Sequence, residues 1–109
     1  MIRLEKIGFD LLTETTKEQF DKIFAEHSGK IERRLKDVEY CRVMLKEYGQ
    51  GKRTKFSIHV LVSYAGKTVE ADATEWDLRK TVHIAFNRIE QEIEHMFHVS
   101  DMKNHRENR

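Results

Sequence analysis

The chain has 109 residues, of which 36% are charged and 39% hydrophobic, and its 20 Lys and Arg residues against 19 Asp and Glu residues give a formal net charge of +1. A length near one hundred residues is typical of one compact domain, and mixed charges together with six phenylalanines, three tyrosines and one tryptophan argue against intrinsic disorder. A single cysteine, Cys41, excludes an internal disulfide, and we expect a cytoplasmic protein because we find neither a secretory leader nor an apolar run of about 18 residues.

The first third of the chain predicts a short strand and then a long helix. Ile2 and Leu4 lie two residues apart, which is the spacing of a half-buried strand. A helix is predicted from Thr15, because an N-cap threonine with Glu18 three residues later satisfies free backbone N–H groups. Gly29 costs roughly 1 kcal/mol relative to alanine inside a helix and predicts a kink or a break. The apolar stripe of this helix consists of Phe20, Ile23, Phe24, Ile31, Leu35 and Val38.

Three strands are predicted next, because the hydrophobic period changes to two. The first of these strands has two unlike faces, which are Cys41, Val43 and Leu45 on one side and Tyr40, Arg42, Met44, Lys46 and Tyr48 on the other. A basic loop over residues 49–53 and a turn over residues 65–67 separate the three strands. The alternating apolar residues are Phe56, Ile58, Val60, Val62 and Tyr64, and then Val69, Ala71 and Ala73.

A second helix is predicted after Asp77, whose carboxylate can accept the free N–H groups of a first turn. Its apolar stripe consists of Leu78, Val82, Ala85, Phe86, Ile89, Ile93 and Phe97. The order β-α-β-β-β-α predicts an α+β fold, in which two helices pack on one face of a four-stranded sheet, similar to double-stranded-RNA-binding domains. We expect a single domain over residues 1–99 and a flexible polar tail over residues 100–109.

Charge is distributed unevenly along the chain. Residues 27–55 carry nine Lys and Arg against four acidic residues, whereas residues 56–78 carry one lysine against four acidic residues. Cations neutralise phosphates and aromatic rings stack on bases, so the basic stretch predicts RNA binding, with ordinary surface charge as the alternative. The candidate RNA-binding residues are Arg33, Arg34, Lys36, Tyr40, Arg42, Lys46, Lys52, Arg53, Lys55, Arg79, Lys80 and Arg88. Lys52 and Arg53 are the strongest candidates of this set, because a loop between strands can reach into a groove of the RNA.

The histidines raise the question of a metal site. His95 and His98 lie three residues apart beside Glu94, a spacing that can present two ligands on one helix face. Structural zinc sites need a third and a fourth ligand, and Cys41 belongs to the core face of a strand distant in sequence. We therefore expect neither a metal nor a cofactor, and interpret Cys41 as a small apolar core residue.

His59 shares the predicted open sheet face with Ser57 and Ser63, a combination that nucleophilic catalysis uses. The sequence shows neither a dedicated carboxylate to orient the histidine nor a glycine-shaped elbow, so we expect no enzyme and no small-molecule substrate. Glu70 and Asp72 are instead expected to pair across the sheet with His59, Lys55 or Arg42, or alternatively to repel RNA and so limit the area that it covers. Trp76 is expected to bury its ring at the start of the second helix, whereas an exposed indole there would be a recognition element.

Two groups of residues resemble segments of a known family. The first group is Glu75, Trp76, Asp77 and Leu78 followed by Val82, Phe86, Ile89 and Ile93, and the second is Lys30, Ile31, Glu32 and Leu35 followed by Val43, Met44, Leu45 and Lys46. They are similar to the start of the second helix, and to the end of the first helix with the second strand, in the short ribosome hibernation factors (hibernation-promoting factor and ribosome-associated inhibitor, or protein Y). The resemblance covers most of the chain.

This resemblance implies a cytoplasmic protein of translation regulation and stress response. It would bind rRNA of the small ribosomal subunit near the decoding centre, overlap the mRNA and tRNA positions and so silence idle ribosomes. Two alternatives remain open: a general structured-RNA-binding domain, or a protein-interaction module that uses the acidic residues of the second helix, Glu90, Glu92 and Glu94. The oligomeric state does not follow from the sequence.

Overall fold

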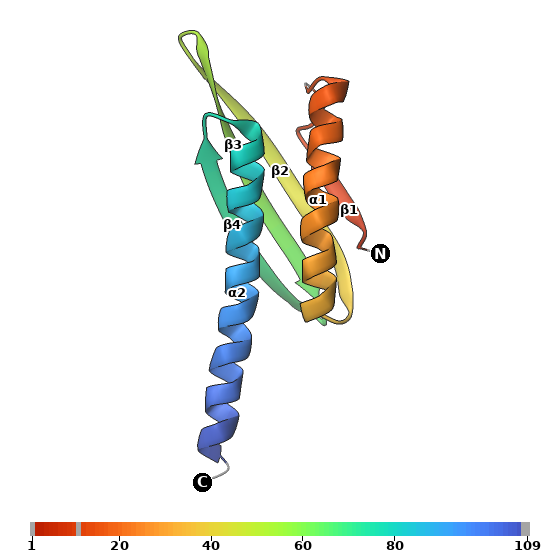
Figure 1. The fold of residues 1–109 in the computed structure, drawn as a ribbon, viewed down its shortest axis with the longest axis vertical. Coiled ribbons are helices and arrows are strands. Elements are labelled where there is room, and N and C mark those ends of the chain that lie inside the picture. Colours follow the sequence, from red (N-terminus) through yellow and green to blue (C-terminus); the bar gives the residue numbers. More distant parts are fainter. Residues whose placement is uncertain (1, 11, 108–109) are drawn as a thin grey trace.

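Two helices lie side by side on one face of a four-stranded sheet (Figure 1). This computed structural model describes residues 2–10 and 12–107, with side chains described for residues 2–10, 12–49 and 51–96. The elements are β1 (Leu4–Ile7), α1 (Glu14–Arg34), β2 (Val38–Gln50), β3 (Arg53–Tyr64), β4 (Lys67–Glu75) and α2 (Leu78–Glu107). The predicted α+β fold of order β-α-β-β-β-α is therefore confirmed.

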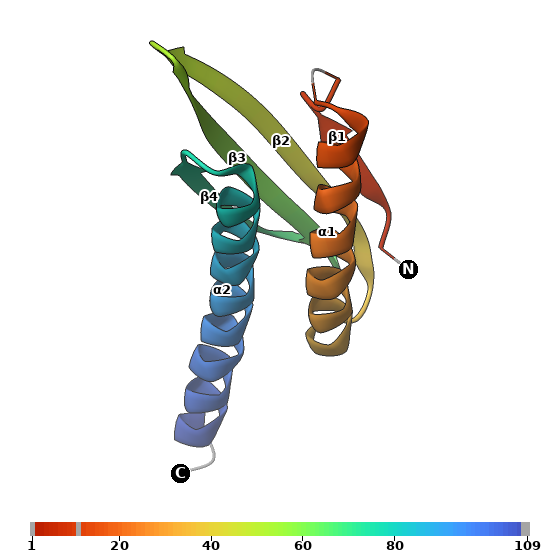
Figure 2. The same cartoon turned by 45° about the horizontal axis from the view of Figure 1, so that its top comes forward.

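The strands are arranged in the order β1-β2-β3-β4. β1 runs parallel to β2, because α1 carries the chain back across the sheet between them, while β2, β3 and β4 are joined by hairpins and run antiparallel. β2 and β3 are the longest strands, and the tip of their hairpin projects past both helices (Figures 1 and 2). This tip is the most protruding part of the sheet.

The β2–β3 turn is tighter than the predicted loop over residues 49–53. Gln50 pairs with Arg53, so only Gly51 and Lys52 form the turn, and Gly51 takes the positive φ of +64° that such turns require. The predicted loop boundaries are wrong because the ladder of hydrogen bonds continues to Gln50 despite the glycine before it. Lys52 thus lies at the tip, and Arg53 begins β3.

The start of α1 also differs from the prediction. Thr13, not Thr15, is the N-cap, because Thr13 has an extended backbone and its hydroxyl oxygen accepts a hydrogen bond of 3.2 Å from the backbone N–H of Thr16. The helix then continues through Gly29 without a break and ends at Arg34. The cost of this glycine is offset by the burial of apolar residues on both sides of it.

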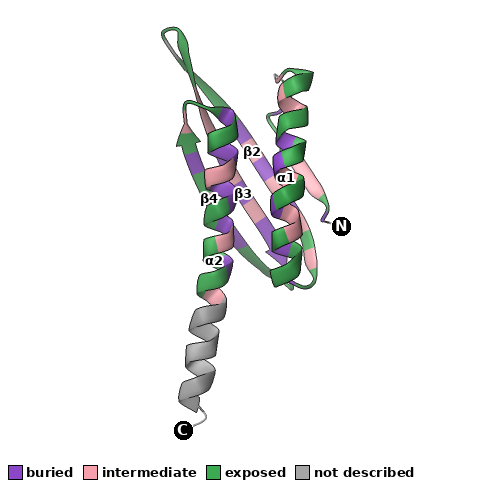
Figure 3. Cartoon of the chain, in the orientation of Figure 1, coloured by how far each residue is buried: buried purple, intermediate pink, exposed green. Residues whose placement is uncertain are grey.

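The core fills the space between the helices and the sheet, as the buried residues in Figure 3 show. Phe20 of α1 and Phe86 of α2 are fully buried, and the predicted stripe of α2 is buried from Leu78 to Ile93. Val38, assigned to the stripe of the first helix, belongs instead to β2. The side chain of Phe97, predicted as the last member of the α2 stripe, lies outside the described residues.

The last helix is longer than expected. α2 continues to Glu107, past the sheet (Figure 1), so the backbone of residues 100–107 is helical where an aperiodic tail was expected. The domain limits of 1–99 and the mobility of residues 100–109 stay predictions, and residues 108–109 lie outside the described part. Within the described chain, neither helix has the length and apolar character needed to cross a membrane.

Candidate nucleic-acid interface

The sheet face opposite the helices is organised in rows of cross-strand neighbours. The predicted alternation of β2 is confirmed, since Cys41, Val43 and Leu45 are buried against the helices and the residues between them point to the open face. From the hairpin end, the rows are Tyr48 and Lys55, then Lys46, Ser57 and Thr74, then Met44, His59 and Asp72, then Arg42, Leu61 and Glu70, and finally Tyr40, Ser63 and Thr68.

Trp76 completes the row nearest the hairpin. Glu75 pairs with Phe56, so the next residue along the chain, Trp76, comes beside Lys55. The guanidinium carbon of Arg53 lies 4.3 Å from the centroid of the indole ring, and Nζ of Lys55 lies 5.3 Å from it. Trp76 is 36% exposed, so the prediction that its ring is buried was wrong. The reason is that position 76 continues the outward alternation of β4.

These side chains form one cluster, which we call the hairpin patch. It consists of Lys46, Tyr48, Lys52, Arg53, Lys55 and Trp76. Within the described residues, no carboxylate forms an ion pair with any of its four cations. Tyr48 and Trp76 are two of the three large hydrophobic residues that the described surface exposes. The patch therefore combines free positive charge with accessible aromatic rings.

The other half of the open face carries the carboxylates. A carboxylate oxygen of Glu70 lies 2.9 Å from Nε2 of His59, which confirms the predicted cross-strand pair. Nε of Arg42 donates a hydrogen bond of 2.9 Å to Glu5 of β1, and its guanidinium stacks on Tyr40 at 5.2 Å. The hydrogen bond and the charge of Glu5 raise the pKa of Arg42 above its already high usual value. Arg42 and Tyr40 are thus engaged within the protein.

The remaining predicted cations lie on the helix side, away from the hairpin patch. Arg33, Arg34 and Lys36 lie at the C-terminal end of α1 and just after it, and this end of α1 is far from the hairpin tip (Figure 1). Arg34 forms a 3.0 Å ion pair with Glu94, and Nε of Arg33 donates to the carbonyl oxygen of Gly29. This group is partly neutralised by contacts within the protein.

The cations of α2 have different surroundings from one another. Arg79 and Lys80 are exposed in the first turn of the helix. This turn follows the predicted N-cap, Asp77, and the carboxylate of Asp77 accepts a 3.0 Å hydrogen bond from the backbone N–H of Arg79. Arg88 instead reaches the edge of the sheet, where its guanidinium donates a 2.6 Å hydrogen bond to the carbonyl oxygen of Asp72 in β4. The predicted set therefore does not form one surface.

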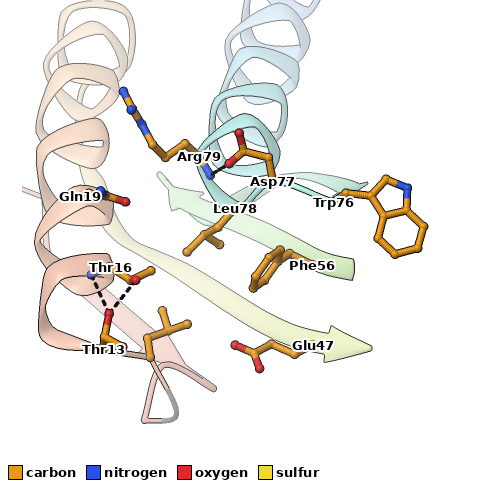
Figure 4. A pocket seen from close by; sticks show the side chains of 10 residues that line it. Thr13, Thr16, Gln19, Glu47, Phe56, Trp76, Asp77, Leu78 and Arg79 are labelled. Atoms are coloured by element: carbon orange, nitrogen blue, oxygen red, sulfur yellow. Dashed lines mark hydrogen bonds between the residues drawn. The ribbon is translucent and has the colours of Figure 1, made fainter. Parts of the chain in front are cut away.

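A cavity of about 520 Å³ lies where the first turns of both helices meet β2 and β3 (Figure 4). Its apolar wall includes Phe56 and Leu78, and its charged groups are Glu47, Asp77 and Arg79. The indole of Trp76 points away from it. Because carboxylates outnumber the cation, the cavity is not suited to a phosphate.

A buried polar cluster that the sequence interpretation missed joins the two helices. His27 of α1 is 2% exposed, with Nδ1 at 2.9 Å from a carboxylate oxygen of Glu90 and Nε2 at 3.1 Å from Nδ1 of His83, both in α2. Its ring also stacks on Phe86. A signal was present, because His27 falls in the helical stripe between Phe24 and Ile31.

This cluster bears on the hypothesis that the acidic residues of α2 form a protein-interaction surface. Glu90 pairs with His27 and Glu94 pairs with Arg34, so two of the three carboxylates contact residues of α1. Glu92 is exposed and has no ion pair among the described residues. Glu90 therefore belongs to the contact between the helices, whereas Glu94 pairs with Arg34 at the surface and Glu92 is exposed.

Among the described residues, His59 contacts Glu70, and no hydrogen bond joins it to Ser57 or Ser63. In the described part of the chain, no three His, Cys, Asp or Glu side chains come together as metal ligands. The side chain of His98 lies outside that part. Ser57 accepts a hydrogen bond from Thr74, and burial raises the pKa of the Cys41 thiol to about 12.

The sequence matches no protein-family model and no curated protein. Among solved structures, the fold is similar to a ribosomal subunit interface protein from Coxiella burnetii, with a TM-score of 0.57 and 18% identity over 87% of this chain and 94% of the other. It is also similar to the N-terminal domain of Protein Y from Thermus thermophilus, with a TM-score of 0.57 and 19% identity over 87% of this chain and 97% of the other. The chain has the fold of these proteins. The resemblance to ribosome hibernation factors is thereby confirmed at the level of the fold.

Proposed function

We propose that the protein is a ribosome-associated translation inhibitor of the hibernation-factor type. It would bind rRNA of the small subunit near the decoding centre and block the mRNA and tRNA positions. The observation that carries the proposal is the extent of the structural match, which takes in nearly the whole length of a ribosomal subunit interface protein and of a Protein Y domain. The match therefore includes almost all of the fold of each of the two proteins.

The surface chemistry supports RNA as the partner. The hairpin patch presents four cations without carboxylate partners in the described chain, and the sheet holds them on one protruding hairpin. Neutralising phosphates with such cations releases counterions, which gives binding energy that falls steeply with salt. A factor that inhibits translation by occupying the mRNA and tRNA positions needs a surface that fits rRNA in shape and charge. It does not need to catalyse a reaction, so the proposed factor is not an enzyme.

The protein-interaction alternative is weaker in the light of the contacts of α2. It relied on the three glutamates of that helix, and two of these pair with His27 and Arg34. A general reader of structured RNA would share the hairpin patch but would not compete with mRNA or tRNA. Competition therefore separates it from the hibernation function.

The proposal is tested by cosedimentation with purified small ribosomal subunits through a sucrose cushion at about 50 and about 200 mM salt. Saturable binding that weakens with salt and is displaced by mRNA and initiator tRNA is the expected result. Binding without displacement would favour the general RNA reader, and no binding at the lower salt would overturn the proposal.

A pair of charge reversals locates the contact. Lys52→Glu with Arg53→Glu removes two cations of the hairpin patch and is expected to abolish binding. Lys17→Glu with Lys67→Glu is the control of equal charge change, since these cations lie on α1 and at the opposite end of β4 from the hairpin. Equal binding by the two folded double variants would remove the hairpin from the interface.

A further inference from the structure

We propose that the hairpin patch is a stacking site for unpaired RNA bases, with Trp76 and Tyr48 as the stacking rings and its four cations as the phosphate contacts. This inference rests on the proposed function and names the kind of RNA that this face takes. It adds Trp76 and Tyr48 to the candidate binding residues.

The two rings are placed to act together. Lys55 lies between them in one row of the open face, with Tyr48 on β2 to one side and Trp76 at the end of β4 to the other. Neighbouring strands lie about 4.8 Å apart, so the rings are separated by about 10 Å on a framework of paired backbone. Tyr48 is 47% exposed. A sheet holds side chains in fixed directions, and bases can dock on both rings without rearrangement of the backbone.

Two cations of the patch, Arg53 and Lys55, lie against the ring of Trp76 and form no ion pair among the described residues. Arg53 and Lys55 both approach the face of Trp76, and this contact fixes the indole while leaving their charge uncompensated. A phosphate between neighbouring bases supplies the missing negative charge. An Arg and an aromatic ring that touch each other can hold a base and its phosphate at the same time.

The distribution of charge on the open face limits where RNA can bind. The two rows nearest the hairpin contain no carboxylate, whereas the next two rows contain Asp72 and Glu70. A phosphate chain is repelled from those rows and is confined to the hairpin end. Unpaired RNA fits this surface better than a duplex, because bases within a duplex hide the faces that an aromatic ring must reach.

Trp76 is the only tryptophan of the chain, so its fluorescence reports directly on the site. The experiment titrates the protein with a single-stranded oligouridylate of about ten nucleotides and, separately, with an RNA duplex of the same length. We expect saturable quenching by the single strand, weakened by salt, and little quenching by the duplex. Absence of quenching by the single strand, or equal quenching by the duplex, would overturn the stacking site.

Variants are compared by fluorescence anisotropy of the labelled oligonucleotide. Trp76→Ala and Tyr48→Ala are each expected to lower affinity by about five- to 150-fold, since stacking on one ring contributes about 1–3 kcal/mol. Trp76→Phe keeps an aromatic face and is expected to retain most of the affinity. Ile7→Ala is the matched control, because Ile7 is an equally exposed apolar residue of the same face, on β1. Alanine variants that bind like this control would contradict the inference.

The outcomes separate this inference from the proposed function. If Trp76→Ala and the native protein cosediment equally with ribosomal subunits and bind the oligonucleotide equally, the stacking site is wrong and the ribosomal function stands. If the oligonucleotide quenches Trp76 but ribosomal subunits are not bound, the stacking site stands and the ribosomal function is wrong.

Discussion

Nδ1 of His27 in α1 lies 2.9 Å from a carboxylate oxygen of Glu90 in α2, at a depth where the histidine is almost fully buried. The other ring nitrogen of His27 contacts His83, so both of its polar atoms have partners. Buried polar groups without partners are costly, and this cluster therefore fixes how the two helices lie against each other.

Glu90→Ala is expected to lower the free energy of unfolding by about 2 kcal/mol, because it leaves a buried nitrogen of His27 without a partner. Glu92→Ala replaces an exposed residue of the same helix. It is expected to change the free energy of unfolding by less than about 0.5 kcal/mol. Urea denaturation followed by circular dichroism measures both. Equal stability of the two variants would show that the contact does not stabilise the helix pair.

Gly8→Ala is expected to destabilise the protein by about 3 kcal/mol or more. Gly8 has a φ of +84°, and a Cβ atom there would collide with the backbone carbonyl of Leu45 in β2. Gly49→Ala is the control, since a Cβ atom at that position meets no other atom within 4 Å and the backbone is ordinary strand. Thermal unfolding of both variants tests the difference, and a Gly8→Ala protein as stable as Gly49→Ala would refute it.

Periodicity was sufficient to predict the elements of this fold, because each has one buried face. The alternation in β2 and β3 and the stripe of α2 from Leu78 to Ile93 all correspond to buried residues in the structure. The boundaries failed where two residues of the same type compete, as at Thr13 and Thr15, or where strand pairing continues past a glycine, as at Gly49. Such choices depend on tertiary contacts that local sequence does not contain.

The candidate site was predicted less completely. Charge along the chain identified Lys52, Arg53 and Lys55, but it also included Arg33 and Arg88, which lie on the helix side. The sequence could not separate these groups, since doing so requires the strand register and the placement of the helices.

Two residues of interest could have been found from their positions alone. Trp76 has the same parity as the outward residues of β4, and His27 lies in the buried stripe of α1. Trp76 was assigned by residue type instead of by position, and His27 was given no role, which is why the exposed indole and the buried imidazole were missed.

Cys41 is expected to be unreactive towards thiol reagents at pH 8 in the folded protein, because burial raises its pKa to about 12 and leaves almost no thiolate. The sign of the pH effect follows from the same shift. Between pH 9 and about pH 12 the unfolded chain loses the thiol proton more readily than the folded chain, so this residue lowers stability as the pH rises through that range. Reaction with a disulfide reagent should be fast only in denaturant, and fast reaction of the native protein would contradict the burial of Cys41.

Arg88→Ala is expected to affect stability and not RNA binding. Its guanidinium donates to the carbonyl oxygen of Asp72 on β4, the edge strand, and loss of this hydrogen bond should lower the free energy of unfolding by about 1 kcal/mol. The same bond covers part of the sheet edge, so its loss also favours strand-to-strand association between copies. Denaturation measures the first effect, and light scattering at rising concentration measures the second. Lys80→Ala removes an equal charge from the same helix and should change neither quantity. If Arg88→Ala were as stable as Lys80→Ala but bound ribosomal subunits less well, Arg88 would belong to the RNA interface after all.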